Sequence, residues 1–116
     1  MNTNYKQHDL DAKAFYIMTF TDKVTNDQMI KIGVSRNPKS RRTQLSYRNK
    51  VKFTILETFP FSRDDYAHGL ENRVKEHFSH DNKVSLKEGF NEVIPFSEEN
   101  ITKILSIVEE YRLTRQ

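Results

Sequence analysis

The sequence KIGVSRNPKSRRTQL, residues 31–45, decides the expected fold. It continues an alternation that places Ile30, Ile32 and Val34 on one side of a strand and Lys31 and Gly33 on the other. Asn37-Pro38 follows, and this pair is typical of a helix start. Asparagine is a favoured N-cap, and proline is tolerated at the first helical position. The stretch therefore predicts a strand over 28–35, a turn, and a helix from Pro38 to about Tyr47.

The segments on either side predict three further strands and two more helices. KAFYIMTF (13–20) is rich in aromatic and β-branched residues, and the Thr-, Asp- and Asn-rich TDKVTND after it predicts a hairpin loop. VKFTILETF (51–59) alternates as a strand, and Pro60 is expected to end it. FNEVIPF (90–96) predicts a short strand at a sheet edge or strand end, because Pro95 cannot donate to a neighbour.

Apolar residues recur at helical spacing in the two remaining segments. One stripe follows Asp64 and extends to about Ser79, and the other follows the Ser97-Glu98-Glu99 cap. The expected core residues are Ala67, Leu70, Val74, Phe78, Ile101, Ile104, Leu105, Val108 and Tyr111. The order of elements predicts an α+β fold, with a small central, mostly antiparallel sheet of three to four strands flanked by helices.

Length and composition indicate one folded domain. The chain has 116 residues, 35% of them hydrophobic, so we expect a flexible arm over 1–12 and a single domain over 13–116. The absence of cysteine excludes disulfides, thiolate zinc sites and cysteine nucleophiles. No apolar run approaches the roughly 20 residues of a membrane span, and the first residues carry no apolar signal segment. We expect a cytoplasmic protein, in the host cytoplasm if the source is viral.

Positive charge is concentrated in one part of the chain. Between Asp27 and Glu57 there are eight basic residues and no acidic one, while the whole chain carries only +3, so the remainder carries −5. Repulsion among these positive charges opposes the compact state, and a polyanion bound against them would offset that repulsion. The expected nucleic-acid-binding residues are Arg36, Lys39, Arg42, Arg48, Lys50 and Lys52. Tyr47 could stack on a base, although a partly buried packing role is the expected one.

The order of elements and four segments together resemble the GIY-YIG nuclease superfamily, and in particular its small phage-type branch with KIG as the second triplet. The segments are AFYIM (14–18), KIGVSRNPKSRRTQL (31–45), HGLENRVKEHF (68–78) and KEGFNEV (87–93). The resemblance implies a DNA endonuclease that uses one divalent metal ion. It also implies catalytic roles for Tyr16, Arg41 and Glu71, with the late family asparagine at Asn91. Lys31 stands where the second signature tyrosine is expected, and Ala14 stands where a glycine is frequent.

The implied residues suit phosphodiester hydrolysis. Glu71, at the margin of the apolar helix stripe, would hold Mg²⁺, with Mn²⁺ as an alternative, because a site of one carboxylate, phosphate oxygens and waters fits that ion. Arg41 would contact the scissile phosphate through its planar guanidinium. Arg42 points elsewhere and would contact a neighbouring phosphate.

Two arrangements could move the proton. Lys31 beside Tyr16 would lower the pKa of the phenol, so that Tyr16 serves as the general base. Alternatively, Lys31 itself is the base, if burial depresses the pKa of its amine. A core tyrosine and an exposed strand lysine are the plain structural alternatives. Gly33 would either let a phosphate approach the backbone or mark a bulge.

Two functions remain open. The first is a metal-dependent endonuclease with DNA as its partner and weak intrinsic sequence specificity, acting alone, as a homodimer or with a protein partner. The second is a non-catalytic module of the same fold that binds nucleic acid or protein as an inhibitor or regulator. The missing second tyrosine favours the module, and the presence of Tyr16, Arg41 and Glu71 favours the nuclease.

Overall fold

The computed structural model describes residues 12–78 and 93–114 and confirms the expected α+β class. Several predicted features lie outside the described residues: residues 1–11 of the expected arm, the 80–89 loop, the first part of the 90–96 strand, and Asn91. Four antiparallel strands form one sheet in the order β3-β1-β2-β4. The elements are β1 (Lys13–Thr21), β2 (Gln28–Ser35), α2 (Pro38–Asn49), β3 (Thr54–Phe61), α3 (Asp64–His77), β4 (Val93–Pro95) and α4 (Glu98–Thr114).

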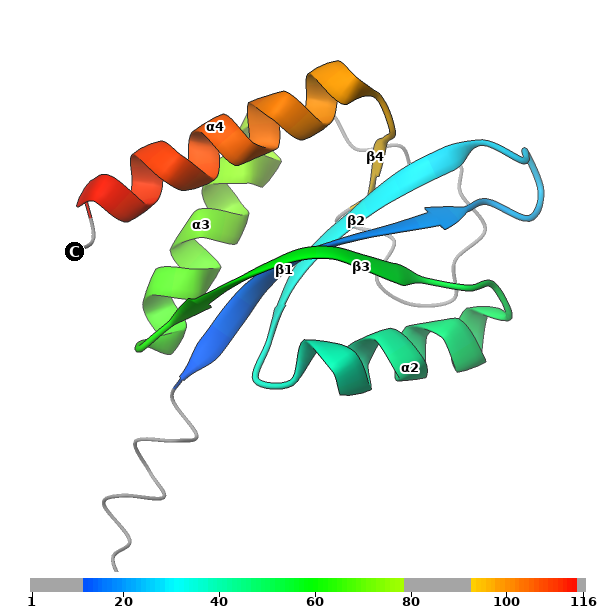
Figure 1. The fold of residues 1–116 in the computed structure, drawn as a ribbon, viewed down its shortest axis with the longest axis horizontal. Coiled ribbons are helices and arrows are strands. Elements are labelled where there is room, and N and C mark those ends of the chain that lie inside the picture. The colour runs from blue at the N-terminus through cyan, green and yellow to red at the C-terminus, as the bar shows by residue number, and fades with distance from the viewer. Residues whose placement is uncertain (1–11, 79–92, 115–116) are drawn as a thin grey trace, which may run out of the picture.

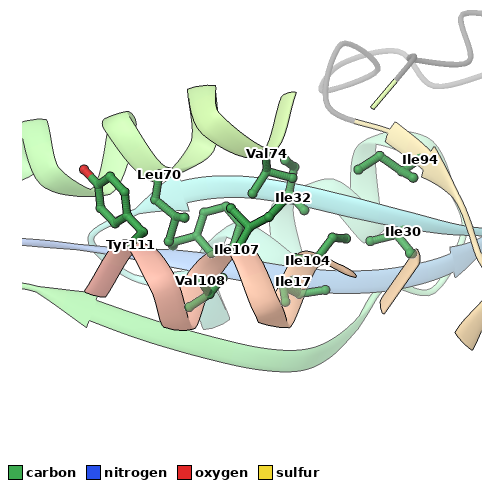
Figure 2. Close-up of a cluster of buried hydrophobic side chains, with 11 residues drawn as sticks. Ile17, Ile30, Ile32, Leu70, Val74, Ile94, Ile104, Ile107, Val108 and Tyr111 are labelled. Carbon is green, nitrogen blue, oxygen red and sulfur yellow. The ribbon is translucent and has the colours of Figure 1, made fainter. Parts of the chain in front are cut away.

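Helices cover both faces of this sheet. Figure 1 shows α2 on one side and α3 with α4 on the other. Because side chains of a strand alternate between faces, β1 and β2 contribute to two separate cores. Phe15, Ile17 and Ile32 pack with α3 and α4 in the first core, most of which Figure 2 shows. Tyr16 and Met18 pack with Leu45 of α2 in the second.

Strand β3 begins later and ends later than its sequence pattern suggests. Residues 51–53 precede it, and Pro60 lies inside it, paired with Ala14. The prediction that Pro60 breaks the strand was wrong, because β3 is an edge strand with an unpaired side, where a missing N–H is tolerated. Pairing with β1 shifts between Ile17 and Met18, so Leu56 is the extra residue of a bulge.

The two apolar stripes are largely confirmed. Ala67, Leu70 and Val74 are buried on α3, and Phe78 packs against the same core. On α4 the buried residues are Ile104, Ile107, Val108 and Tyr111. Leu105 was placed in the core wrongly, since it is 38% exposed one position beyond Ile104, and Ile107 takes its place. No helix in the described ranges is long and apolar enough to cross a bilayer.

Polar interactions lie at the starts of α3 and α4. Ser97 Oγ accepts from the N–H of Asn100 at 3.0 Å at the start of α4, as expected for an N-cap. Before α3, the Arg63 guanidinium donates to both carboxylate oxygens of Asp65 at 3.0 Å. This pairing holds the pKa of the Asp65 carboxyl below its usual value.

Helix α2 is attached to the sheet by very little apolar surface. Leu45 is its one fully buried apolar side chain, with Asn49 buried beside it. A helix this polar gains little free energy from core packing.

We therefore predict that Leu45→Ala lowers the free energy of unfolding by about 2–5 kcal/mol, measured by urea denaturation. The matched control is Leu113→Ala, because Leu113 is 70% exposed on α4; its expected change is within about 0.5 kcal/mol. Equal losses in the two variants would contradict this view of α2.

Candidate nucleic-acid interface

Local chemistry starts helix α2 where the sequence predicts it. The Asn37 side chain accepts a hydrogen bond from the N–H of Ser40 at 3.1 Å, and Pro38 occupies the first turn. The first turn contains no acidic residue. The positive pole of the helix dipole at this end is thus left without a carboxylate from its own first turn, which favours the approach of an anion.

Two guanidinium groups lie at this end of α2. Arg36 and Arg41 line one surface hollow, together with Ser35, Asn37, Ser40 and Gln44. Arg41 Nη1 donates to Gln44 Oε1 at 2.6 Å, which orients the guanidinium along the helix. The hollow therefore combines two cations with a helix N-terminus, an arrangement that suits a phosphate group.

The C-terminal end of α2 is also basic. Lys50 has φ 57° and ψ 36°, the left-handed conformation in which glycine is the usual residue, and its N–H donates to Ser46 O. Lys23, from the turn between β1 and β2, donates to Asn49 O at 3.2 Å. Sequence reasoning missed Lys23 because its hairpin loop also contains aspartates. The hairpin pairing, however, brings its charge to the end of α2.

The predicted binding residues are mostly solvent-exposed. Arg36, Lys39, Arg48, Lys50 and Lys52 are exposed, and Arg42 is half-buried. Arg36, Lys39, Arg42, Lys50 and Lys52 form no ion pair with a carboxylate of the described residues. We define the α2 basic surface as the predicted binding residues together with two further cations. It consists of Arg36, Lys39, Arg42, Arg48, Lys50, Lys52, Lys23 and Arg41. Tyr47 lies within it and is 83% exposed, so the expectation of partial burial was wrong. Leu45 already fills the inward side of the helix, and Tyr47 lies about 200° further round.

Tyr16 and Lys31 lie together beneath α2, as their strand positions predict. Both belong to the sheet face that α2 covers, and Lys31 Nζ is 6.0 Å from the centroid of the Tyr16 ring. Each side chain is 1% exposed, so the exposed-lysine alternative was wrong. Lys31 Nζ donates to Ile32 O at 2.9 Å, which compensates part of the cost of burying an ammonium group.

Gly33 creates the space that Tyr16 occupies. It pairs in regular register with Tyr16, so the alternative that Gly33 marks a bulge was wrong. A Cβ atom at Gly33 would overlap the hydroxyl and Cζ of the Tyr16 ring. The glycine therefore serves close packing within the protein, and it is itself buried.

Glu71 lies on α3, across the sheet from α2. Its side chain is 14% exposed, and Glu71 Oε1 is 3.5 Å from His68 Nδ1. His68 Nε2 is 3.0 Å from Asp64 Oδ1, which in turn is 3.1 Å from Lys13 Nζ. Sequence reasoning missed His68, although its spacing of three and four residues from these carboxylates is the signal of one shared helix face.

Glu71 on α3 and Arg41 on α2 each lie on the flank of their helix that faces the β2 side of the sheet. On α3, Gly69 and Arg73 contact Tyr111 of α4, so Glu71 lies on the flank away from α4. On α2, Lys39 lines a hollow with Ile55, Thr58 and Pro60, which places that flank over β3. Arg41 lies on the opposite flank of α2. The structure thus brings Tyr16 to Lys31 and Arg36 to Arg41, and places Glu71 on α3, which covers the other face of the sheet.

A comparison with known families accounts for nearly all of the described chain. The T5orf172 domain, a phage-associated domain related to nuclease-type folds, matches residues 14–109. No curated protein and no solved structure matches the chain. The match begins within β1 and ends in α4, and so contains the second core, the first core except Tyr111, and the α2 basic surface. The chain therefore belongs to the T5orf172 domain family, and is a nuclease-like or DNA-binding module.

Proposed function

We propose that the protein is a metal-dependent endonuclease that hydrolyses DNA phosphodiester bonds with weak intrinsic sequence specificity. This proposal rests on the composition of helix α2. The helix carries basic but no acidic side chains, and Leu45 is its one fully buried apolar side chain. A helix of this kind contributes little to the core, whereas its charge matches a polyanionic backbone. The family match supports the same class of partner.

The scissile phosphate would lie at the β2 edge of the sheet, between the hollow at the N-terminus of α2 and the flank of α3 that carries Glu71. Arg41 would contact a non-bridging oxygen through its planar guanidinium, and Arg36 would neutralise further charge on the same or the next phosphate. Lys39, Arg42, Arg48, Lys50 and Lys52 would bind the flanking backbone. In hydrolysis, the oxygen of a water molecule bonds to phosphorus and one P–O bond to the sugar breaks, leaving a phosphate monoester and a hydroxyl group.

Glu71 is the proposed protein ligand for Mg²⁺, with Mn²⁺ as an alternative. The described residues contain no group of three His, Asp or Glu side chains that could chelate a metal ion by themselves. A single carboxylate with hard oxygen donors fits Mg²⁺, which keeps several of its waters, better than it fits Zn²⁺. When bound, such an ion neutralises developing charge and activates water. Asp64 and His68 would orient the Glu71 carboxylate.

The general base that accepts the proton of the attacking water would be either Tyr16 or Lys31. Both lie on the sheet face that α2 covers, but both are enclosed. This enclosure favours a second candidate function, a non-catalytic module that binds nucleic acid or a protein and acts as an inhibitor or regulator. Cutting both strands with one site would require a homodimer or two successive encounters.

The nuclease proposal predicts metal-dependent nicking. Purified protein with Mg²⁺ should nick supercoiled plasmid, EDTA should stop the reaction, and Arg41→Ala or Glu71→Ala should lower the rate by at least about 100-fold. Glu109→Ala, on the exposed side of α4, should nick as the wild type does. Circular dichroism would show that each variant is folded. Wild-type protein that binds DNA but never cuts it with Mg²⁺ or Mn²⁺ would establish the non-catalytic alternative.

The α2 basic surface predicts binding that depends steeply on salt. If roughly six of its side chains contact phosphates, affinity for duplex DNA should fall about 1000-fold between about 50 mM and about 200 mM salt, because binding releases counterions. Fluorescence anisotropy at several salt concentrations measures this slope. An affinity that is flat over the same range would exclude DNA as the partner.

Lys50 predicts a trade between stability and binding. Lys50→Gly should raise the free energy of unfolding by about 1 kcal/mol, because glycine adopts the left-handed conformation without strain. The same variant should reduce the salt slope of DNA binding by about one unit. The control Lys39→Ala should reduce the slope equally without a gain in stability. If Lys50→Gly stabilises the fold but binds DNA as the wild type does, Lys50 is not part of the interface.

A further inference from the structure

We propose that α2 is a groove-binding helix that inserts into the major groove of duplex DNA. Its outward side, formed by Ser40, Gln44 and Tyr47, would contact base edges, while basic side chains on its two flanks contact the two phosphate backbones. This inference rests on the proposed function for the identity of the partner. It adds the form of the DNA, the groove that is occupied and the residues that set sequence preference.

The packing of α2 defines which side faces outward. Leu45 and Asn49, four residues apart, are both buried and mark the inward side. With 3.6 residues per turn, Tyr47 lies about 180° from the midpoint between them, and Ser40 and Gln44 lie one to two turns away on the same outward side. The exposures agree, since Ser40 and Gln44 are exposed and Tyr47 is 83% exposed.

Basic side chains lie on both flanks of this outward side. Arg41 and Arg48 are seven residues apart and form a row on one flank. Lys39 lies on the other flank, and Lys50 follows the last helical residue in the left-handed conformation. Two hollows that adjoin at Arg36 and Asn37 distinguish the flanks: Arg41 lines the one that contains Gln44, and Lys39 lines the one that contains β3 residues.

Cations on opposite flanks match two backbones rather than one. The major groove is about 12 Å wide, which admits one α-helix between the two strands that bound it. The row from Arg41 to Arg48 is about 10 Å long, or about three phosphates of one strand at the axial spacing of B-DNA. A single strand would engage the cations of only one flank.

The aromatic content also favours a duplex. Proteins that follow a single strand usually stack successive bases on several aromatic side chains. Among the large exposed hydrophobic residues in the part of the chain that the structure describes, Tyr47 is the only aromatic. One exposed ring suits contact with a thymine methyl group or a base edge, and does not provide a continuous stacking path.

Gln44 is positioned to donate toward a base. Its Oε1 accepts from Arg41 Nη1 at 2.6 Å, so the amino group is the part of the amide that remains to donate to an acceptor such as guanine O6 or thymine O4. Arg41 would in this way link a phosphate contact to a base contact. A helix of 12 residues reaches few base pairs, so the preference is confined to a short sequence.

The test is a selection from a randomised duplex pool, followed by anisotropy measurements on the enriched duplex, an unrelated duplex and each single strand. Wild-type protein should bind the enriched duplex about tenfold or more tightly than the unrelated one. Tyr47→Ala and Gln44→Ala should largely remove that difference. Lys39→Ala should weaken binding to both duplexes equally, and Leu113→Ala on α4 should match the wild type. Methyl green, a major-groove ligand, should compete, and netropsin, a minor-groove ligand, should not.

The possible outcomes separate this inference from the proposed function. Suppose that DNA binding depends steeply on salt and the protein nicks DNA, but the selection enriches no sequence. This result would overturn the groove-binding helix and leave the nuclease proposal standing. The same conclusion would follow if Tyr47→Ala and Gln44→Ala were indistinguishable from the wild type. Equal affinity for single strands, or displacement by netropsin alone, would do the same. An absence of DNA binding at low salt would overturn both.

Discussion

Burial of β1 and β2 on both faces is the constraint on which the structure depends. Alternate side chains of the same two strands enter two different cores, so each strand needs a cover on each side. Helices α3 and α4 supply one cover with a broad apolar surface, and α2 supplies the other with little more than Leu45. The same alternation encloses Tyr16 and Lys31 in the thinner layer and leaves Glu71 on the thicker side.

The thin cover explains the unusual chemistry of α2. A helix anchored by one leucine leaves its outward side open to solvent, and the chain uses this part of the structure for cations, a capping asparagine and an exposed tyrosine. Several of these choices cost stability, among them like-charge repulsion and a lysine in the left-handed conformation. A bound polyanion would offset the repulsion, which gives the surface a physical reason to persist in a small domain.

Features that depend on local chemistry could be predicted from the sequence. Asn37-Pro38 fixed the start of α2, the apolar stripe of α3 identified its buried residues, and the hairpin between β1 and β2 followed from its loop composition. Features that depend on tertiary packing could not. Pro60 is accommodated because β3 became an edge strand, Lys31 is buried because two layers cover β2, and Leu105 faces outward because Ile107 completes the stripe. The placement of Arg41 and Glu71 on opposite faces likewise depends on topology, which residue spacing along the chain does not contain.

Nuclear magnetic resonance can decide whether the α2 side of the sheet is the DNA-binding face. Amide chemical shifts would be followed in ¹⁵N-labelled protein during titration with a short duplex. The largest shift changes are expected in residues 36–52 and at the turn containing Lys23, with little change on the exposed side of α4. Largest changes on α4, with residues 36–52 unaffected, would contradict this expectation.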